Sequence, residues 1–222
     1  MKKLRVFFAA AIFVLAFSVF VHGEIGTDDA LQKLMAGNGR YVSGQLASRD
    51  LSDAKRKGLV ADQHPSATVL TCSDSRVSPT LLFDQGLGDV FVVRTAGNVV
   101  DKIALGSLEY GVEHLHTPVL VILGHQSCGA VTAAFDAKGK PEGNIGAILK
   151  KIGPSVRKVK SANHKDRGEM INLAVQQNVR AVYADIMKNS PAIRELVKEG
   201  KLKVVLAEYY LDSGKVEEIA SK

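Results

Sequence analysis

From residue 67 onward, short and almost wholly apolar runs alternate with longer mixed segments. Such runs are typical of strands in a parallel sheet that is covered on both faces, because neither face then meets water. Strands that alternate with helical segments predict an α/β fold with right-handed crossovers. The predicted strands occupy 67–71, 90–93, 118–123 and 202–207, and the predicted helices lie near 78–84, 102–115, 127–137 and 166–189.

The segment before the first strand has a helical pattern. Leu31, Leu34 and Met35 recur at helical spacing, which predicts a helix over 24–44 that ends at a glycine. A second, polar helix is expected within 50–63. These helices would precede the sheet in the chain.

The end of the chain is expected to fold back on the sheet. Asp212-Ser213-Gly214 is a turn signal within 208–219, and it predicts a final strand that runs antiparallel to its neighbour. The expected fold class is therefore α/β: a mainly parallel four-stranded sheet with an antiparallel C-terminal edge strand, flanked by helices.

The first 23 residues have the layout of a secretory signal peptide. Lys2, Lys3 and Arg5 precede an apolar run over 6–21, and small residues follow. The run is short for a membrane-spanning helix, which needs about 20 residues. We therefore expect a signal peptide over 1–23, a single domain over 24–222, and a periplasmic or secreted protein. An uncleaved membrane anchor is the alternative.

The charge of the chain does not point to nucleic acid. The formal net charge is +6, and residues 1–23 contribute three of the basic residues and no acidic one. The remaining excess is small and dispersed, whereas nucleic-acid binding calls for a basic patch or stripe. We interpret the basic residues near 150–165 as a solvated surface.

Two motifs follow directly on predicted strands. CSDSR at 72–76 follows the first strand, and GHQSCG at 124–129 follows the third. The carboxyl ends of parallel strands are where open α/β sheets bind their ligands. Both motifs are expected at that edge, facing one another.

The side chains in these motifs suit a zinc ion. Cys72, Cys128 and His125 offer two thiolates and an imidazole, and three protein ligands leave a fourth position for water, as in catalytic zinc sites. Zinc lowers the pKa of its water to roughly 7, which supplies a hydroxide nucleophile. The alternative is one disulfide between the two cysteines, as is usual in exported domains. The histidine favours the metal.

Asp74 and Arg76 are expected to form a pair beside the metal. Residues two apart on an extended segment point to the same side, and a guanidinium can hold a carboxylate with two hydrogen bonds. Asp74 would then either accept a hydrogen bond from the zinc-bound hydroxide or replace the water as fourth ligand. The pattern leaves both arrangements open.

With these motifs the chain resembles the β-carbonic anhydrase family over roughly 31–219. The stretches that carry the resemblance are CSDSRV at 72–77, FVVRTAGN at 91–98 and GHQSCGAV at 124–131. The resemblance implies one Zn²⁺ per chain, reversible hydration of carbon dioxide, and a homodimer or homotetramer with active sites at subunit interfaces. It implies Cys72, His125 and Cys128 as zinc ligands and Asp74 with Arg76 as the catalytic dyad.

The resemblance also implies a substrate pocket. Gln63 matches a glutamine whose amide donates to the substrate, and Phe91 and Tyr110 match residues that line an apolar pocket for carbon dioxide. Backbone amides near Gly129 would suit the bicarbonate anion. Two other functions stay open: hydrolysis of carbonyl sulfide or carbon disulfide at the same site, and a non-catalytic zinc-binding module. A purely structural zinc site would not need Asp74 and Arg76.

Overall fold

The computed structural model describes residues 25–139, 143–162 and 166–220. The expected signal peptide lies outside the described residues. In the described part of the chain no helix is both long and apolar enough to cross a membrane.

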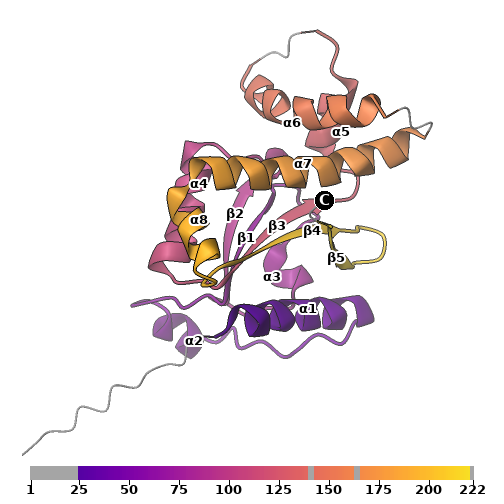
Figure 1. The fold of residues 1–222 in the computed structure, drawn as a ribbon. Helices are drawn as coiled ribbons and strands as arrows, with labels where there is room; N and C mark the ends of the chain where they lie inside the picture. Colours follow the sequence, from indigo (N-terminus) through magenta and orange to yellow (C-terminus); the bar gives the residue numbers. More distant parts are fainter. Residues whose placement is uncertain (1–24, 140–142, 163–165, 221–222) are drawn as a thin grey trace, which may run out of the picture.

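A five-stranded sheet forms the centre of the molecule (Figure 1). Its strand order is β2-β1-β3-β4-β5, with every neighbouring pair parallel except the last, which is antiparallel. This confirms the expected fold class, including the antiparallel edge strand at the C-terminus. The strands are β1 (Ala67–Cys72), β2 (Val90–Thr95), β3 (Val119–His125), β4 (Lys203–Tyr209) and β5 (Val216–Glu218).

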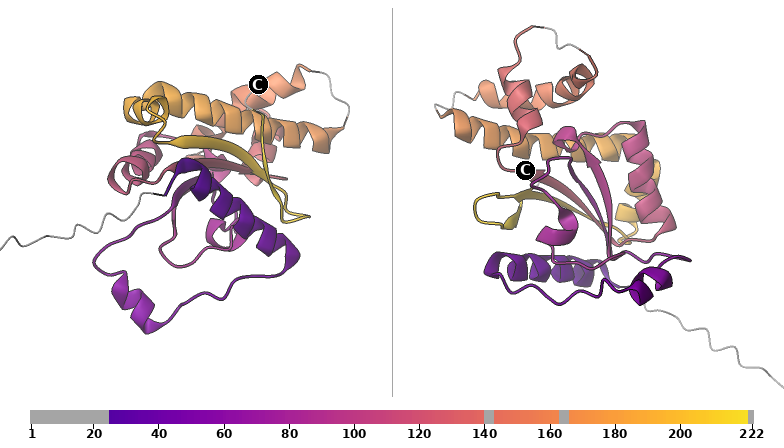
Figure 2. Two further views of the ribbon diagram at one scale, coloured as in Figure 1. Left: turned by 60° about the horizontal axis from the view of Figure 1, so that its bottom comes forward. Right: turned by 180° about the vertical axis from the view of Figure 1, so that it is seen from behind.

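Helices cover both faces of the sheet, as Figures 1 and 2 show. Helices α1 (Thr27–Ser43) and α3 (Pro79–Leu82) pack on one face, around the buried Leu34 and Phe83. Helices α4 (Lys102–Glu109), α7 (Arg167–Asn189) and α8 (Pro191–Lys198) pack on the other. β1 and β3 are buried along their whole length, which explains their continuous apolar runs.

A smaller lobe stands on α7. Helices α5 (Gly129–Asp136) and α6 (Ile145–Lys160) pack against α7 around Val131, Ile152 and Val175, and both cysteines belong to the same cluster. The lobe therefore builds one wall beside the carboxyl ends of β1 and β3.

Some predicted helices differ from those observed. Within 50–63 only α2 (Asp53–Gly58) is helical, because this polar segment has no apolar face to bury. The helix expected over 102–115 is α4 followed by the π-helical turn η2 (Tyr110–His114).

Two helices, α6 and α8, were missing from the prediction. The apolar residues of α6 recur at helical spacing among many lysines, which led to its interpretation as surface. Helix α8 begins with the capping pair Ser190-Pro191, a recognisable start signal.

Candidate metal centre

Three potential metal ligands meet at the carboxyl edge of the sheet. Cys72 ends β1, His125 ends the neighbouring β3, and Cys128 precedes α5. All three are buried, and their ligand atoms lie within 4.8 Å of one another. Parallel pairing of β1 with β3 brings the first two together, and a sharp turn at Ser127, with φ of 55°, returns the third.

The cysteines are not joined by a disulfide. Their Sγ atoms lie 4.0 Å apart, about twice the length of an S–S bond, and both thiols are free. The disulfide alternative for Cys72 and Cys128 is therefore wrong for this structure. A separation near 4 Å suits two thiolates that share a tetrahedral metal ion.

His125 presents one unpaired nitrogen to the thiols. Its Nδ1 lies 2.9 Å from the carbonyl oxygen of Gln126, so that nitrogen carries the proton and donates. Its Nε2 is buried and has no hydrogen-bond partner among the described residues. A buried acceptor without a donor is costly in a folded protein. The arrangement fits a zinc ion at this position, coordinated by Nε2 and the two sulfurs.

The surroundings favour a thiolate at Cys72. The hydrogen bond from Cys128 lowers the pKa of Cys72 despite burial, and the backbone N–H of Gly97 also donates to the sulfur, at 3.2 Å. The shared hydrogen bond and burial raise the pKa of Cys128, whereas the N–H groups of Ala130 and Val131 at the start of α5 lower it. Thiolate is the form of cysteine that binds metal.

Asp74 and Arg76 form the expected pair. Arg76 Nε and Nη2 donate to Oδ1 and Oδ2 of Asp74 at 2.9 and 2.7 Å. The guanidinium hydrogen bonds hold the pKa of Asp74 far below its usual range, although burial opposes the shift. Asp74 Oδ2 lies 3.8 Å from Nε2 of His125. The pair thus stands beside the three ligands.

Asp74 and Arg76 were expected to meet because residues two apart in an extended segment point to the same side, and this explanation is wrong. The segment after β1 is a tight turn and not an extended strand. The backbone N–H of Arg76 donates to Oδ1 of Asp74 at 3.0 Å, and the N–H of Val77 donates to the Asp74 carbonyl at 3.0 Å. An aspartate that bonds the backbone two residues on is a common turn device.

The predicted substrate-pocket residues lie elsewhere in the protomer. Phe91 pairs with Thr68, four residues before Cys72. It therefore lies roughly 13 Å along the strand from the three potential metal ligands. Its ring packs against Tyr110, with ring centroids 5.9 Å apart, and Tyr110 and Gln63 line one cavity of about 480 Å³. These three residues lie together within one protomer, but away from the potential metal ligands of the same chain. Gly129, by contrast, directly follows Cys128.

Two residues that were given no role support the site. Arg94 donates from Nε to the Cys72 carbonyl at 3.1 Å and from Nη2 to the Asp74 carbonyl at 2.7 Å. Gln126 carries the carbonyl that accepts from His125. Both lie within the motifs that carry the family resemblance, but only their hydrogen bonds in the folded structure show that they support the site.

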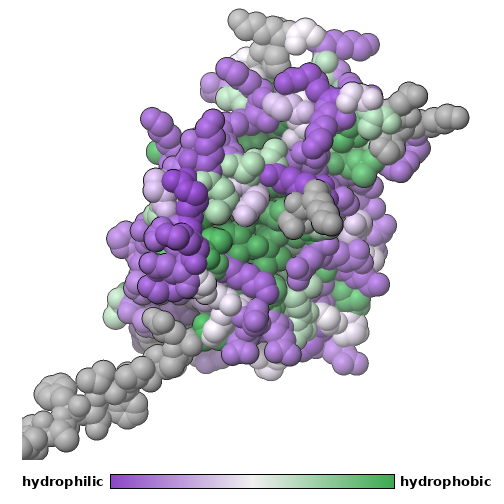
Figure 3. Space-filling view, viewed as in Figure 1, coloured by the Kyte–Doolittle hydropathy of each residue, from purple (hydrophilic) through white to green (hydrophobic). Residues whose placement is uncertain are grey.

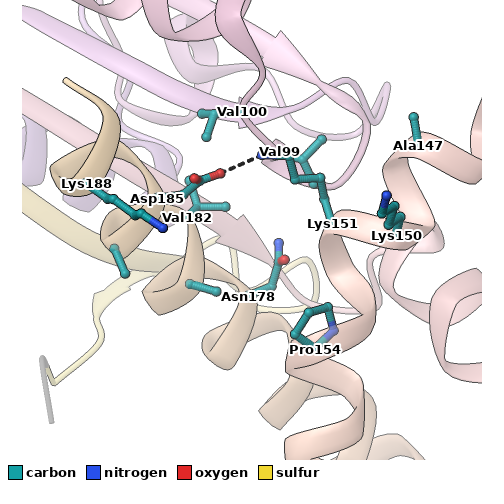
Figure 4. Close-up of a pocket in the computed structure, with 12 residues that line it drawn as sticks. Val99, Val100, Ala147, Lys150, Lys151, Pro154, Asn178, Val182, Asp185 and Lys188 are labelled. Carbon is teal, nitrogen blue, oxygen red and sulfur yellow. Dashed lines mark hydrogen bonds and ion pairs between the residues drawn. The ribbon is translucent and has the colours of Figure 1, made fainter.

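A further cavity, of about 640 Å³, lies between α6 and α7 (Figure 4). Apolar residues line most of it, and Lys151 and Asp185 form a 2.7 Å ion pair across it. Asn178 on its wall donates to the carbonyl of Gly97, at 2.9 Å. Through Asn178, the wall of this cavity is therefore hydrogen-bonded to the segment that follows β2.

The sequence of this chain is similar to those of known carbonic anhydrases. A family model described as carbonic anhydrase matches residues 67–216. Carbonic anhydrase 2 of Mycobacterium tuberculosis is 41% identical over 189 residues, which cover 84% of this chain and 89% of the relative. The carbonic anhydrase of Mycolicibacterium smegmatis is 40% identical, with 85% of this chain and 91% of the relative covered.

Solved structures resemble the fold. A tetrameric β-carbonic anhydrase from Sordaria macrospora superposes with a TM-score of 0.70 at 26% identity, covering 86% of this chain and 95% of that one. The Coccomyxa β-carbonic anhydrase, solved with acetazolamide, gives a TM-score of 0.65 at 29% identity, covering 85% and 86%.

Proposed function

The chain belongs to the β-class carbonic anhydrase family and is a carbonate dehydratase, and we propose that it works through one zinc ion held by Cys72, His125 and Cys128. The product would be bicarbonate and a proton, formed reversibly from carbon dioxide. The observation that carries the zinc proposal is the buried, unpaired Nε2 of His125 beside two free thiols.

Zinc, when bound, supplies a Lewis acid that lowers the pKa of a coordinated water to about 7. Asp74 would orient the attacking water by accepting its hydrogen bond at Oδ2. That role needs an ionised carboxylate, and the Arg76 guanidinium keeps the pKa of Asp74 low. Because Arg76 engages both carboxylate oxygens, we propose that the open arrangement is the working one. Asp74 could reach the metal as a fourth ligand only by breaking bonds to Arg76.

We infer that a second copy of the chain completes each site, in a homodimer or homotetramer. Gln63, Phe91 and Tyr110 would line the carbon dioxide pocket of the partner's metal centre, since they lie away from their own. Gly129 would offer its backbone amide to bicarbonate within the same chain.

Exposed apolar surface supports this assembly. The segment 42–64 contains no buried residue, exposes Val42, Leu46, Leu51 and Val60, and projects from the body (Figure 2). Figure 3 shows further apolar surface between α1 and α7. A large exposed apolar patch, such as the one in Figure 3, is typical of an interaction site. The Sordaria macrospora relative is described as tetrameric.

The chain is further proposed to act in the periplasm or outside the cell, on the basis of the signal-like residues 1–23. N-terminal sequencing of the protein isolated from the periplasm or medium should begin near residue 24. Full-length protein in the cytosol would remove this proposal.

The deciding experiment is stopped-flow carbon dioxide hydration by zinc-quantified protein. Wild type should hydrate carbon dioxide with about one zinc per chain. Asp74→Ala should retain zinc and lose most activity, by about 10²-fold or more, as general acid–base contributions do. Asp136→Ala is the matched control, because Asp136 pairs with Arg167 on the surface away from the metal centre.

Full zinc occupancy without hydration between pH 7 and 9 would contradict the proposal. Assays with carbonyl sulfide and carbon disulfide would then follow on the same samples. Activity on neither would favour a zinc-binding module without catalysis.

A further inference from the structure

Gln126 links the turn after β3 to the hairpin between β4 and β5. Its side-chain Oε1 accepts from the backbone N–H groups of Leu211 and Asp212 at 3.0 and 3.4 Å. Its Nε2 donates to the Asp212 carboxylate at 3.1 Å, and its backbone N–H donates to the carbonyl of Tyr209 at 2.9 Å. A single half-buried residue therefore makes four hydrogen bonds to a segment about 85 positions later in the chain.

The hairpin is itself firmly held. Tyr210 N–H donates to the Lys215 carbonyl at 2.8 Å, and Gly214 N–H donates to the Tyr210 carbonyl at 2.9 Å. From α1, Asn38 donates to the Gly214 carbonyl at 2.9 Å. The segment to which Gln126 is hydrogen-bonded is thus a fixed turn, which is also hydrogen-bonded to α1.

The carbonyl of Gln126 sets the direction of His125. It accepts the proton on Nδ1 of His125, so its position decides where Nε2 points. The next residue, Ser127, has φ of 55°, a conformation uncommon for residues other than glycine. A turn of this kind needs support from outside, and the side chain of Gln126 supplies it.

We propose that Gln126 is a positioning residue for the metal: anchored by the β4–β5 hairpin, it fixes the carbonyl that aims His125 Nε2 at Cys72 and Cys128. This inference rests on the zinc site of the proposed function but not on the hydration reaction. Partners that orient a metal-ligating histidine typically change metal affinity by about 10–100-fold when removed.

The test variant is Gln126→Met, which keeps the length of the side chain and removes its donor and acceptor. Zinc affinity, measured by competition with a chromophoric chelator, should fall by about 10–100-fold. In Co²⁺-substituted protein, the visible absorption bands should shift, because the imidazole no longer approaches the metal in the same direction. A merely structural role would lower stability without moving these bands.

A swapped pair provides the rescue. In the double variant Gln126→Glu with Asp212→Asn, the new carboxylate still accepts from the N–H groups of positions 211 and 212, and the new amide donates to that carboxylate. Every hydrogen bond of the side chain is thereby restored, and only the bond between the two side chains reverses its direction. Its zinc affinity and Co²⁺ spectrum should return to those of wild type. Lys215→Ala is the matched control within the hairpin, since the Lys215 side chain is exposed and the hydrogen bonds of this residue to Ser213 and Tyr210 are made by its backbone.

Wild-type zinc affinity and an unchanged Co²⁺ spectrum in Gln126→Met would overturn the proposal. So would a folded swap variant that binds zinc no better than Gln126→Glu alone, a comparison that also decides the matter if Gln126→Met does not fold. Protein that binds zinc and responds to these variants but hydrates no carbon dioxide would support this inference while removing the proposed reaction.

Discussion

The backbone N–H of Gly97 donates to the Sγ of Cys72 at 3.2 Å, and the carbonyl of the same glycine accepts from Asn178 at 2.9 Å. The turn after β2 is thereby fixed between Cys72 and α7. Gly97 has φ of 68°, and a Cβ there would lie 2.7 Å from Cδ1 of Ile152. Both the conformation and the available space require glycine.

Gly97→Ala should destabilise the protein by about 1–3 kcal/mol, the usual range for a strained left-handed residue. Displacement of the turn should also loosen the hydrogen bond to Cys72 and weaken zinc binding. Urea unfolding and chelator competition measure the two effects. The control is Gly39→Ala in α1, where a Cβ meets nothing within 4 Å and the helix should gain up to about 1 kcal/mol. Equal changes in the free energy of unfolding and in zinc affinity at both glycines would contradict the role described for Gly97.

Asp84 should make stability depend on acidity. Its buried carboxylate accepts from Arg40 Nε at 2.6 Å, from the Ala47 backbone N–H at 3.0 Å and from Arg49. Burial alone would raise the pKa of Asp84, but these donors lower it overall. A carboxyl with a depressed pKa stabilises the fold above its unfolded pKa, about 3.9, and this contribution is lost as the pH falls through the folded value.

Asp84→Asn should therefore cost about 3–5 kcal/mol near pH 7, as breaking a buried ion pair does. The difference from wild type should shrink as the pH falls below about 4. Asparagine tolerates the positive φ of this position, so backbone strain does not confuse the result. Metal-free proteins should be compared, by urea unfolding at several pH values. Asp53→Asn, in an exposed pair with Lys57, should change little at any pH. A difference that stays constant with pH would exclude the carboxylate as its source.

Zinc removal should expose two thiols. Denatured, zinc-free protein is expected to react with a thiol reagent at both Cys72 and Cys128, because both are free. Native zinc-loaded protein should react slowly, since both sulfurs are buried and would be coordinated. Loss of the metal should also lower the melting temperature, as metal affinity contributes to folding. Two unreactive cysteines after denaturation would indicate oxidation.

Mixing two inactive variants tests whether neighbouring chains share each site. Cys72→Ser removes a ligand, and Tyr110→Ala removes a predicted pocket residue. If Tyr110 acts in the partner's site, a mixed dimer contains one intact site, and random pairing should restore roughly a quarter of wild-type activity. The mixture should be unfolded and refolded together before assay. Full activity in Tyr110→Ala alone, or no recovery on mixing, would contradict a shared site.

The sequence predicted the sheet well and some helices poorly, for physical reasons. Buried strands such as β3 are apolar throughout, so a local window suffices to find them. In helix α6 the buried positions are interspersed with lysines, so its apolar face is hard to recognise in the sequence. Helix α2 has no buried face, so its length depends on its surroundings and not on a local pattern. The pairing of Asp74 with Arg76 was predicted from two-residue spacing, yet a turn produces it.

By itself, the sequence determined which side chains could carry the chemistry. The cysteines, His125 and Asp74 stand at fixed distances after apolar runs, and those distances are local properties of the chain. Only the tertiary structure decided which residues hold them in place. Gln126 reaches the β4–β5 hairpin and Arg94 reaches the turn after β1 because of strand order and loop geometry, which depend on packing across the whole domain. Contacts between residues so far apart in sequence leave no periodic signal along the chain.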